Sequence, residues 1–193
     1  MAFTSTQSPL ARLQEVLFML DYVSQHLPVG SETPFEQVLV ALDQDLPENA
    51  EAQYVMQLFF AEDVMRASGL PEMQEGLDHT ATLQFMLEFP VDCSRLTPER
   101  QLATFSALNL FTQVMPLGNL GINQDKKIFF RYGMMGESQN MNASLVAELI
   151  GMFGFFLSQF GPLLQNFVTS DKSVEALMEE TGFHKAFAGI QPK

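Results

Sequence analysis

Histidine, cysteine and serine are the residues in this 193-residue sequence whose chemistry suits nucleophilic catalysis. A catalytic triad needs a serine or cysteine nucleophile, a histidine base and a carboxylate that meet at hydrogen-bond distance. The histidines and the single cysteine are widely separated, and none has a spacing typical of a triad: His26, His79, Cys93 and His184. Cys93 has no neighbouring base, which favours a structural role for the thiol. The sequence therefore predicts no catalytic residue and a protein that is not an enzyme.

The acidic stretch DQDLPENAE has the densest set of potential metal ligands. Its carboxylates are Asp43, Asp45, Glu48 and Glu51. A calcium loop also needs a glycine and regularly alternating ligands, and Pro47 stands where a ligand would be. Two glycine pairs lack the lysine and the length of a phosphate-binding loop: Gly118 with Gly121, and Gly133 with Gly136. We predict no metal site and no cofactor.

The charge of the chain restricts its partners. Ten Lys and Arg residues stand against 23 Asp and Glu residues, which gives a net charge of −13. Such a surface repels nucleic acid and anionic lipid, and it is compatible with a basic partner or with a client that must be kept soluble. One cysteine allows no internal disulfide, and the N-terminus does not resemble a secretory signal. We expect a cytoplasmic protein.

Capping residues and apolar spacing predict helices, and period-two alternation predicts strands. Ser8 and Thr97 are suited to N-caps, each followed by a proline at the first helical position. The expected helices cover 9–27, 98–115, a long segment that begins near 142 or 144, and 173–180. The expected strands lie at 38–42, 54–60 and 83–89, followed by a hairpin within 117–135 that turns at 123–126. A partly helical excursion, 62–80, separates the second and third strands.

The long helix contains sixteen uncharged residues, LIGMFGFFLSQFGPLL, from Leu149 to Leu164. About twenty apolar residues suffice to cross a bilayer, so a membrane span is one reading. The apolar residues nevertheless fall on one broad face, and the opposite face is polar. This segregation predicts a helix that packs on a sheet in a protein without a membrane span. Phe155 is the exception, since it lies within the polar stripe and is a candidate for a contact outside the domain.

The order of these elements resembles the fold of type III secretion chaperones and is particularly similar to the YbjN-like proteins. The segments that carry the resemblance are LQFMLEFPV, LTPERQLATFSALNLFTQVMPLGNLGINQDKKIFFRYGMM and LSQFGPLLQNFVTSDKSVEAL. It implies an α+β fold with an antiparallel sheet of about five strands, in the order helix, three strands, helix, two strands, helix. The expected organisation is a flexible N-terminus (1–7), one domain (8–168, including the excursion 62–80) and a C-terminal short helix and tail (169–193). The resemblance further implies a small acidic protein, often a dimer, that binds other proteins or unfolded segments.

Two predicted surfaces agree with such binding. One face of the strands mixes apolar and polar residues, a composition that suits an adaptable protein-binding surface or a face covered by another part of the chain. The predicted protein-binding residues are Val55, Phe59, Met86, Phe129, Arg131 and, on the long helix, Phe155. The second expected helix has a further apolar side, and burial under a loop and a homodimer contact are both open explanations for it. The predicted self-association residues are Leu102, Phe105 and Asn109.

The sequence thus gives two functional hypotheses. The first is a non-enzymatic, chaperone-like protein that captures another polypeptide on a sheet face or an open strand edge. The alternative is a YbjN-like regulatory or assembly accessory protein that binds a folded partner complex.

Overall fold

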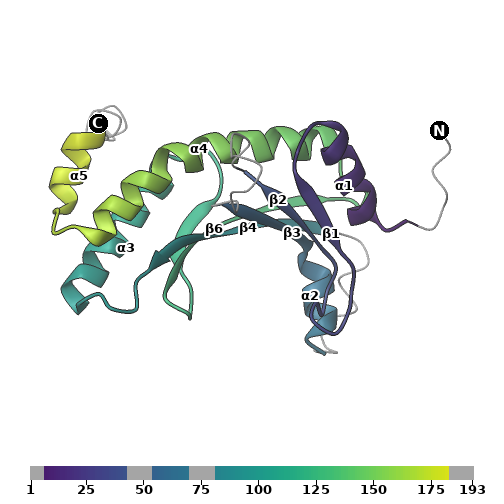
Figure 1. Ribbon diagram of the computed structural model, residues 1–193, viewed down its shortest axis with the longest axis horizontal. Helices are drawn as coiled ribbons and strands as arrows, with labels where there is room; N and C mark the ends of the chain where they lie inside the picture. Colours follow the sequence, from purple (N-terminus) through teal and green to yellow (C-terminus); the bar gives the residue numbers. More distant parts are fainter. Residues whose placement is uncertain (1–6, 43–53, 70–80, 183–193) are drawn as a thin grey trace. The chain divides into compact units, whose positions relative to one another are not determined.

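The computed structural model describes residues 7–42, 54–69 and 81–182. Within these ranges the chain forms five helices and a six-stranded antiparallel sheet in the order β1-β2-β3-β4-β6-β5 (Figure 1). The elements are α1 (Pro9–Met19), β1 (Ser24–Leu27), β2 (Gln37–Ala41), β3 (Val55–Phe60), α2 (Ala61–Ala67), β4 (Ala81–Asp92), α3 (Pro98–Val114), β5 (Asn119–Ile122), β6 (Lys127–Gly136), α4 (Ala143–Thr169) and α5 (Val174–Thr181). The predicted α+β class is confirmed.

The chain divides into two compact units. Unit 1 comprises Met1–Leu87 and Arg131–Gly154, and unit 2 comprises Glu88–Phe130 and Phe155–Lys193. Two strands, β4 and β6, and helix α4 each contribute residues to both units. The predicted domain boundaries stay a prediction.

The core of unit 1 lies between one face of the sheet and two helices. Alternate strand residues are fully buried on that face, as the period-two pattern predicts: Val38, Val40, Met56, Leu58, Leu83 and Phe85. Figure 1 shows α1 and the first part of α4 on this side of the strands. Phe153 of α4 packs its ring 5.5 Å from that of Phe85 and 5.4 Å from that of Tyr132, measured between centroids. These aromatic contacts fix the helix to the sheet.

The predicted first helix is too long, and the structure places an additional strand at its end. Helix α1 ends at Met19, and Asp21 has a positive φ of 63° that turns the chain away from the helix axis. Ser24–Leu27 then pairs antiparallel with β2, with His26 opposite Val38. Backbone pairing with β2 outweighs helix propensity in this segment, which has no apolar helical face of its own. The sheet consequently has six strands instead of about five.

Unit 2 begins its first helix and its hairpin where the sequence predicts them. Thr97 caps α3, since its Oγ1 accepts a hydrogen bond of 3.2 Å from the Arg100 N–H. The hairpin turns between Asn123 and Lys127, where the Asn123 N–H donates to the Lys127 carbonyl at 2.9 Å. Lys126 supplies the left-handed residue of this turn, with φ 62°. Helix α5 follows Ser173, whose Oγ accepts from the Ala176 N–H.

Helix α4 has the two faces that its sequence predicts. Its apolar residues are buried at Val146, Ile150, Phe153, Leu157, Phe160, Leu164, Phe167 and Val168. Its polar residues are exposed at Ser144, Glu148, Ser158, Gln159, Gln165 and Asn166. Leu145 was expected on the apolar face, yet it is exposed because it lies in the first turn, at the margin of the stripe. Among the described residues α4 is also the one helix that could cross a membrane by length and composition, a test that core helices pass as well.

The excursion between β3 and β4 is helical at its start. Helix α2 covers Ala61–Ala67, and the remainder of the predicted excursion, 70–80, lies outside the described residues. Glu62 is buried in this helix, and its Oε2 accepts a hydrogen bond of 3.0 Å from the Thr82 N–H at the start of β4. The acidic stretch 43–51 and the tail 183–193 also lie outside the described residues.

Candidate polypeptide-binding surfaces

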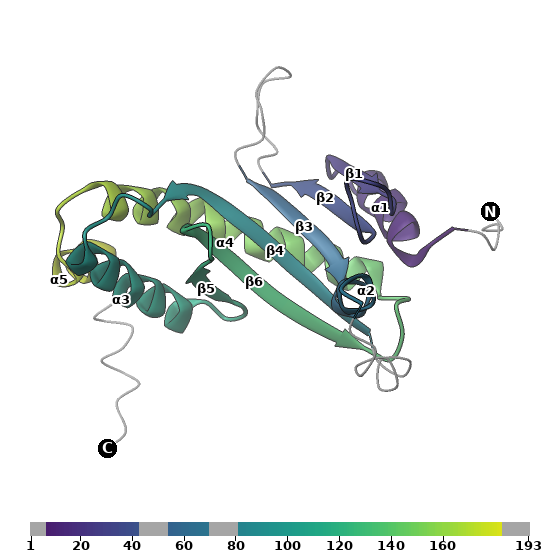
Figure 2. The same ribbon diagram turned by 90° about the horizontal axis from the view of Figure 1, so that it is seen from below.

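The strand residues of unit 1 that alternate with the buried ones form a second face, which we call the outward face. Figure 2 looks at the sheet from this side, with β3 and β4 in front of α4. The outward face comprises Gln25, Leu27, Gln37, Leu39, Ala41, Val55, Gln57, Phe59, Thr82, Gln84, Met86, Arg131, Gly133 and Met135. Arg131 is the one charged residue in this set, which contains no carboxylate. The composition is apolar and rich in amides.

Apolar side chains gather near the middle of the outward face. Met86 lies opposite Gln57 in the β3–β4 register, so it is flanked diagonally by Val55 and Phe59. The Phe59 ring lies 5.3 Å from the Phe35 ring, between centroids, which limits its movement. Val55 is exposed and Phe59 is half-buried, so both present apolar surface beside the Gln57 amide. Rigid aromatic and flexible thioether groups together suit contact with varied side chains.

Arg131 is held on this face by a buried glutamine. Its Nε donates a hydrogen bond of 2.8 Å to Gln84 Oε1, and Gln84 is 4% exposed. Gly133 leaves room for this amide, because a Cβ there would lie 3.0 Å from Gln84 Nε2. The terminal nitrogens of Arg131 form no hydrogen bond with the part of the chain that the structure describes. The guanidinium is thus oriented and remains available to a ligand on the outward face.

Four of the predicted protein-binding residues meet on the outward face, and two lie in unit 2. Val55, Phe59, Met86 and Arg131 belong to unit 1. Phe129 belongs to unit 2, where it is half-buried against Gly121: a Cβ at Gly121 would be 2.7 Å from the Phe129 Cζ. Phe155 is 62% exposed, as expected for a residue in the polar stripe of α4. The binding role of all six stays a prediction.

The second apolar side of α3 is solvent-exposed. Leu102 is 69% exposed and Phe105 is 51% exposed, and Asn109 is exposed one turn after Phe105. The opposite side of the helix is buried through Thr104, Ala107, Leu108 and Phe111. Burial under a loop is therefore not found among the described residues. The predicted self-association residues share one accessible side of unit 2.

A further apolar surface at the end of α1 was missed from the sequence. We call it the α1-end patch, and its residues are 48–71% exposed: Phe18, Met19, Leu20 and Val23. The Tyr22 hydroxyl anchors this segment by donating 3.1 Å to the Ala147 carbonyl, and burial raises the pKa of that hydroxyl. The sequence contained a signal, because three consecutive apolar residues cannot all face one side of a helix. Interpretation of the segment as a longer helix concealed it.

Two histidines and the acidic stretch lie outside the described residues, but His26 is placed. Its Nε2 lies 2.5 Å from Glu36 Oε1, and the Ser8 hydroxyl donates to the same carboxylate oxygen. In a triad the serine hydroxyl is hydrogen-bonded to the histidine, whereas here the serine and the histidine both contact the carboxylate. Within the described ranges no group of three or more His, Cys, Asp or Glu residues could hold a metal ion.

We compared the chain with known proteins, and no protein-family model, curated protein or solved structure matches it. The resemblance to type III secretion chaperones and YbjN-like proteins stays a prediction. Function is therefore argued from the chemistry of the surfaces described above.

Proposed function

We propose that this chain is a non-enzymatic protein that binds another polypeptide through the outward face of unit 1. The observation that supports the proposal most directly is the absence of carboxylates from the fourteen strand residues of that face, in a chain with 23 Asp and Glu residues. Depletion of charge and enrichment of aromatic residues, Met and Arg characterise the centre of protein interfaces. The outward face shares the low charge and the Met and Arg residues, and Phe59 is its one aromatic residue.

The chemistry of the outward face suits an extended client. Apolar side chains of the client would be removed from water against Val55, Phe59 and Met86, which stabilises the complex by about 25 cal/mol per Å² of buried apolar area. Glutamine amides can donate to and accept from client peptide groups. A strand edge offers a second route, since β1 is terminal in the sheet order and, among the described residues, pairs with β2 alone.

The remaining acidic surface would keep such a complex soluble. Net charge far from zero opposes association between copies of the protein, and it repels nucleic acid. We accordingly propose a cytoplasmic protein whose partner is another polypeptide and which needs no cofactor. The family resemblance of the sequence points in the same direction.

The α1-end patch supports a second candidate function, binding to a folded partner as a regulatory or assembly accessory protein. Phe18 and Met19 lie in the last turn of α1, where the Phe18 carbonyl accepts from the Asp21 N–H, so these residues do not offer a strand edge to a client. Exposed helical apolar groups instead fit a preformed complementary surface.

Two matched double variants separate these functions. F59S/M86S alters the outward face and F18S/M19S alters the α1-end patch, both in unit 1. The measurement is binding to a chemically unfolded model protein by fluorescence anisotropy, with circular dichroism and urea unfolding to check the fold. We expect F59S/M86S to weaken binding at least tenfold, since loss of two central contacts costs roughly 1–2 kcal/mol or more.

F18S/M19S should bind the unfolded protein as the wild type does. Unchanged binding by folded F59S/M86S would refute the outward-face proposal. Loss of binding to a folded complex isolated from the native cell, in F18S/M19S alone, would favour the second function.

A further inference from the structure

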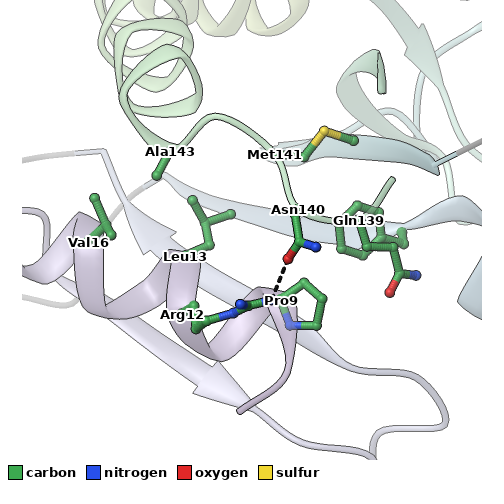
Figure 3. Close-up of a pocket in the computed structure, with 9 residues that line it drawn as sticks. Pro9, Arg12, Leu13, Val16, Gln139, Asn140, Met141 and Ala143 are labelled. Atoms are coloured by element: carbon green, nitrogen blue, oxygen red, sulfur yellow. Dashed lines mark hydrogen bonds between the residues drawn. The ribbon is translucent and has the colours of Figure 1, made fainter. Parts of the chain in front are cut away.

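A cavity in unit 1 is separate from the outward face and is not used by the proposed function. It has a volume of about 300 Å³ and opens between α1 and the segment that precedes α4 (Figure 3). Its lining residues are Pro9, Arg12, Leu13, Val16, Phe60, Gln139, Asn140, Met141 and Ala143. Phe60 belongs to the buried side of β3, so this cavity lies on the helix-covered side of the sheet.

One wall of the cavity is positively charged. Arg12 donates from Nη2 to Asn140 Oδ1, as Figure 3 shows, and this contact positions the guanidinium beside the Asn140 amide. No carboxylate is among the lining residues.

Two carboxylates contact residues at or next to this lining. Glu36 accepts from the hydroxyl of Ser8, the N-cap of α1, and it also contacts His26. Asp63 accepts from the Gln139 amide at 3.2 Å, and its pairing with Arg66 at 2.8 Å offsets its charge.

Two helices also begin at this cavity. Pro9 is the first residue of α1 and Ala143 is the first residue of α4, and both line it. Neither helix has an acidic residue in its first turn, in spite of the acidic composition of the chain. The positive end of the α4 dipole adds to the charge of Arg12, whereas Glu36, bonded to the N-cap Ser8, offsets that of α1. The cavity thus has a local potential that favours an anion, within a chain of net charge −13.

The rest of the wall is apolar. Leu13 and Phe60 are 6% and 1% exposed, and Val16 and Met141 complete this side. A ligand that fills 300 Å³ has roughly ten non-hydrogen atoms, since a water-sized group occupies about 30 Å³. An inorganic anion would leave most of the apolar wall uncovered, whereas a purely apolar ligand would leave the guanidinium without a charged partner.

We propose that this cavity binds a small monocarboxylate with an apolar tail of six to eight carbons, on the order of ten non-hydrogen atoms in all. The carboxylate accepts hydrogen bonds from Arg12 and from the Asn140 amide. The tail lies against Leu13, Val16 and Phe60. This arrangement satisfies both the charged and the apolar wall.

The test uses octanoate as the probe, with octan-1-ol and octylamine as uncharged and cationic controls, in titrations of the whole protein followed by NMR or calorimetry. We expect saturable octanoate binding with a dissociation constant on the order of 0.1–1 mM, as is reasonable for ten non-hydrogen atoms. Arg12→Gln should weaken it roughly tenfold or more, because a charge-assisted hydrogen bond is lost. Arg95→Gln, a substitution of an exposed arginine in unit 2, is the matched control and should bind as the wild type does.

Val16→Phe keeps the test decisive if Arg12→Gln is unstable. The larger side chain would fill the apolar end of the cavity and should abolish octanoate binding, while the Arg12 guanidinium stays in place. Equal binding of octanoate and octan-1-ol, unchanged affinity in folded Arg12→Gln, or no saturable binding would each overturn the proposal. None of these results depends on capture of a polypeptide by the outward face.

Discussion

At the scale of single residues, a partly buried arginine joins segments that are distant in sequence. Arg100 in α3 donates to the carbonyls of Phe167 and Lys172, the second at 2.5 Å, and its guanidinium lies 4.1 Å from the centre of the Phe167 ring. A cation at the C-terminal end of a helix is favourable, and here it satisfies a carbonyl in the last turn of α4. Nothing in the local sequence around Arg100 indicates this partner.

Cys93 should be unreactive in the folded protein. Its side chain is 1% exposed, and burial raises the pKa of the thiol, with a smaller contribution from the Asp92 carboxylate. A raised pKa lowers the thiolate fraction at pH 8, and the thiolate is the reactive form. We expect labelling by a disulfide reagent at pH 8 to be roughly a hundredfold slower than in urea-unfolded protein, which corresponds to about 2.7 kcal/mol of opening free energy.

The measurement is the absorbance change of the released thiolate over time. A native rate equal to the unfolded rate would show that the thiol is accessible and would contradict the burial of Cys93.

At the scale of elements, α4 shows how one helix serves a core and a surface. Its broad apolar stripe is buried, and its polar stripe faces water from Ser144 to Asn166. Pro162 is exposed within the helix, where its lost N–H costs less than it would among buried groups. These two faces are typical of a helix packed on a protein core, and we predict that α4 does not span a membrane.

Two phenylalanines of α4 provide a matched comparison. Phe153 is fully buried against Phe85 and Tyr132, whereas Phe155 is 62% exposed. Phe153→Ala should lower the free energy of unfolding by about 3–4 kcal/mol, because it removes a large buried side chain and leaves a cavity. Phe155→Ala should change it by less than about 0.5 kcal/mol.

Urea unfolding of protein purified from the detergent-free soluble fraction measures both values. Equal effects of the two substitutions, or recovery of the wild type with detergent alone, would contradict the packing of α4.

At the scale of the whole molecule, charge is distributed unevenly over the surface. The outward face and the α1-end patch carry no carboxylate among their own residues, while the chain as a whole is strongly acidic. Long-range repulsion therefore disfavours contact between copies except where apolar surface offsets it. We predict that the exposed apolar side of α3 offsets this repulsion and allows two copies to associate.

Self-association should depend on Leu102 and Phe105. If two copies pack this side of α3 against each other, burial of both residues stabilises the dimer. L102E/F105E would place four carboxylates in that contact, two from each copy. We expect this double variant to raise the dissociation constant of the dimer at least tenfold. Leu145→Glu is the control, since Leu145 is exposed on α4. Light scattering after size exclusion measures the mass. A wild-type mass equal to the monomer at 200 μM would refute this contact.

Much of the local structure was determined by the sequence alone. Helix starts at Ser8 and Thr97, the turn at 123–126, the alternation of the strands and the two faces of α4 follow from capping, backbone propensity and periodicity, which act within a few residues. The same periodicity placed Leu102 and Phe105 on a second side of their helix and Phe155 in a polar stripe, and the tertiary structure decided that the first two are exposed.

Long-range pairing was decided by the tertiary structure. Ser24–Leu27 is a strand because β2 is available to pair with it, and α1 ends within the α1-end patch, at Met19, before that strand begins. The support of Arg131 by Gln84 joins residues 47 positions apart, and the Arg12–Asn140 contact that shapes the cavity joins residues 128 positions apart. Such contacts depend on how the elements pack, and no periodicity within one segment encodes its distant partner.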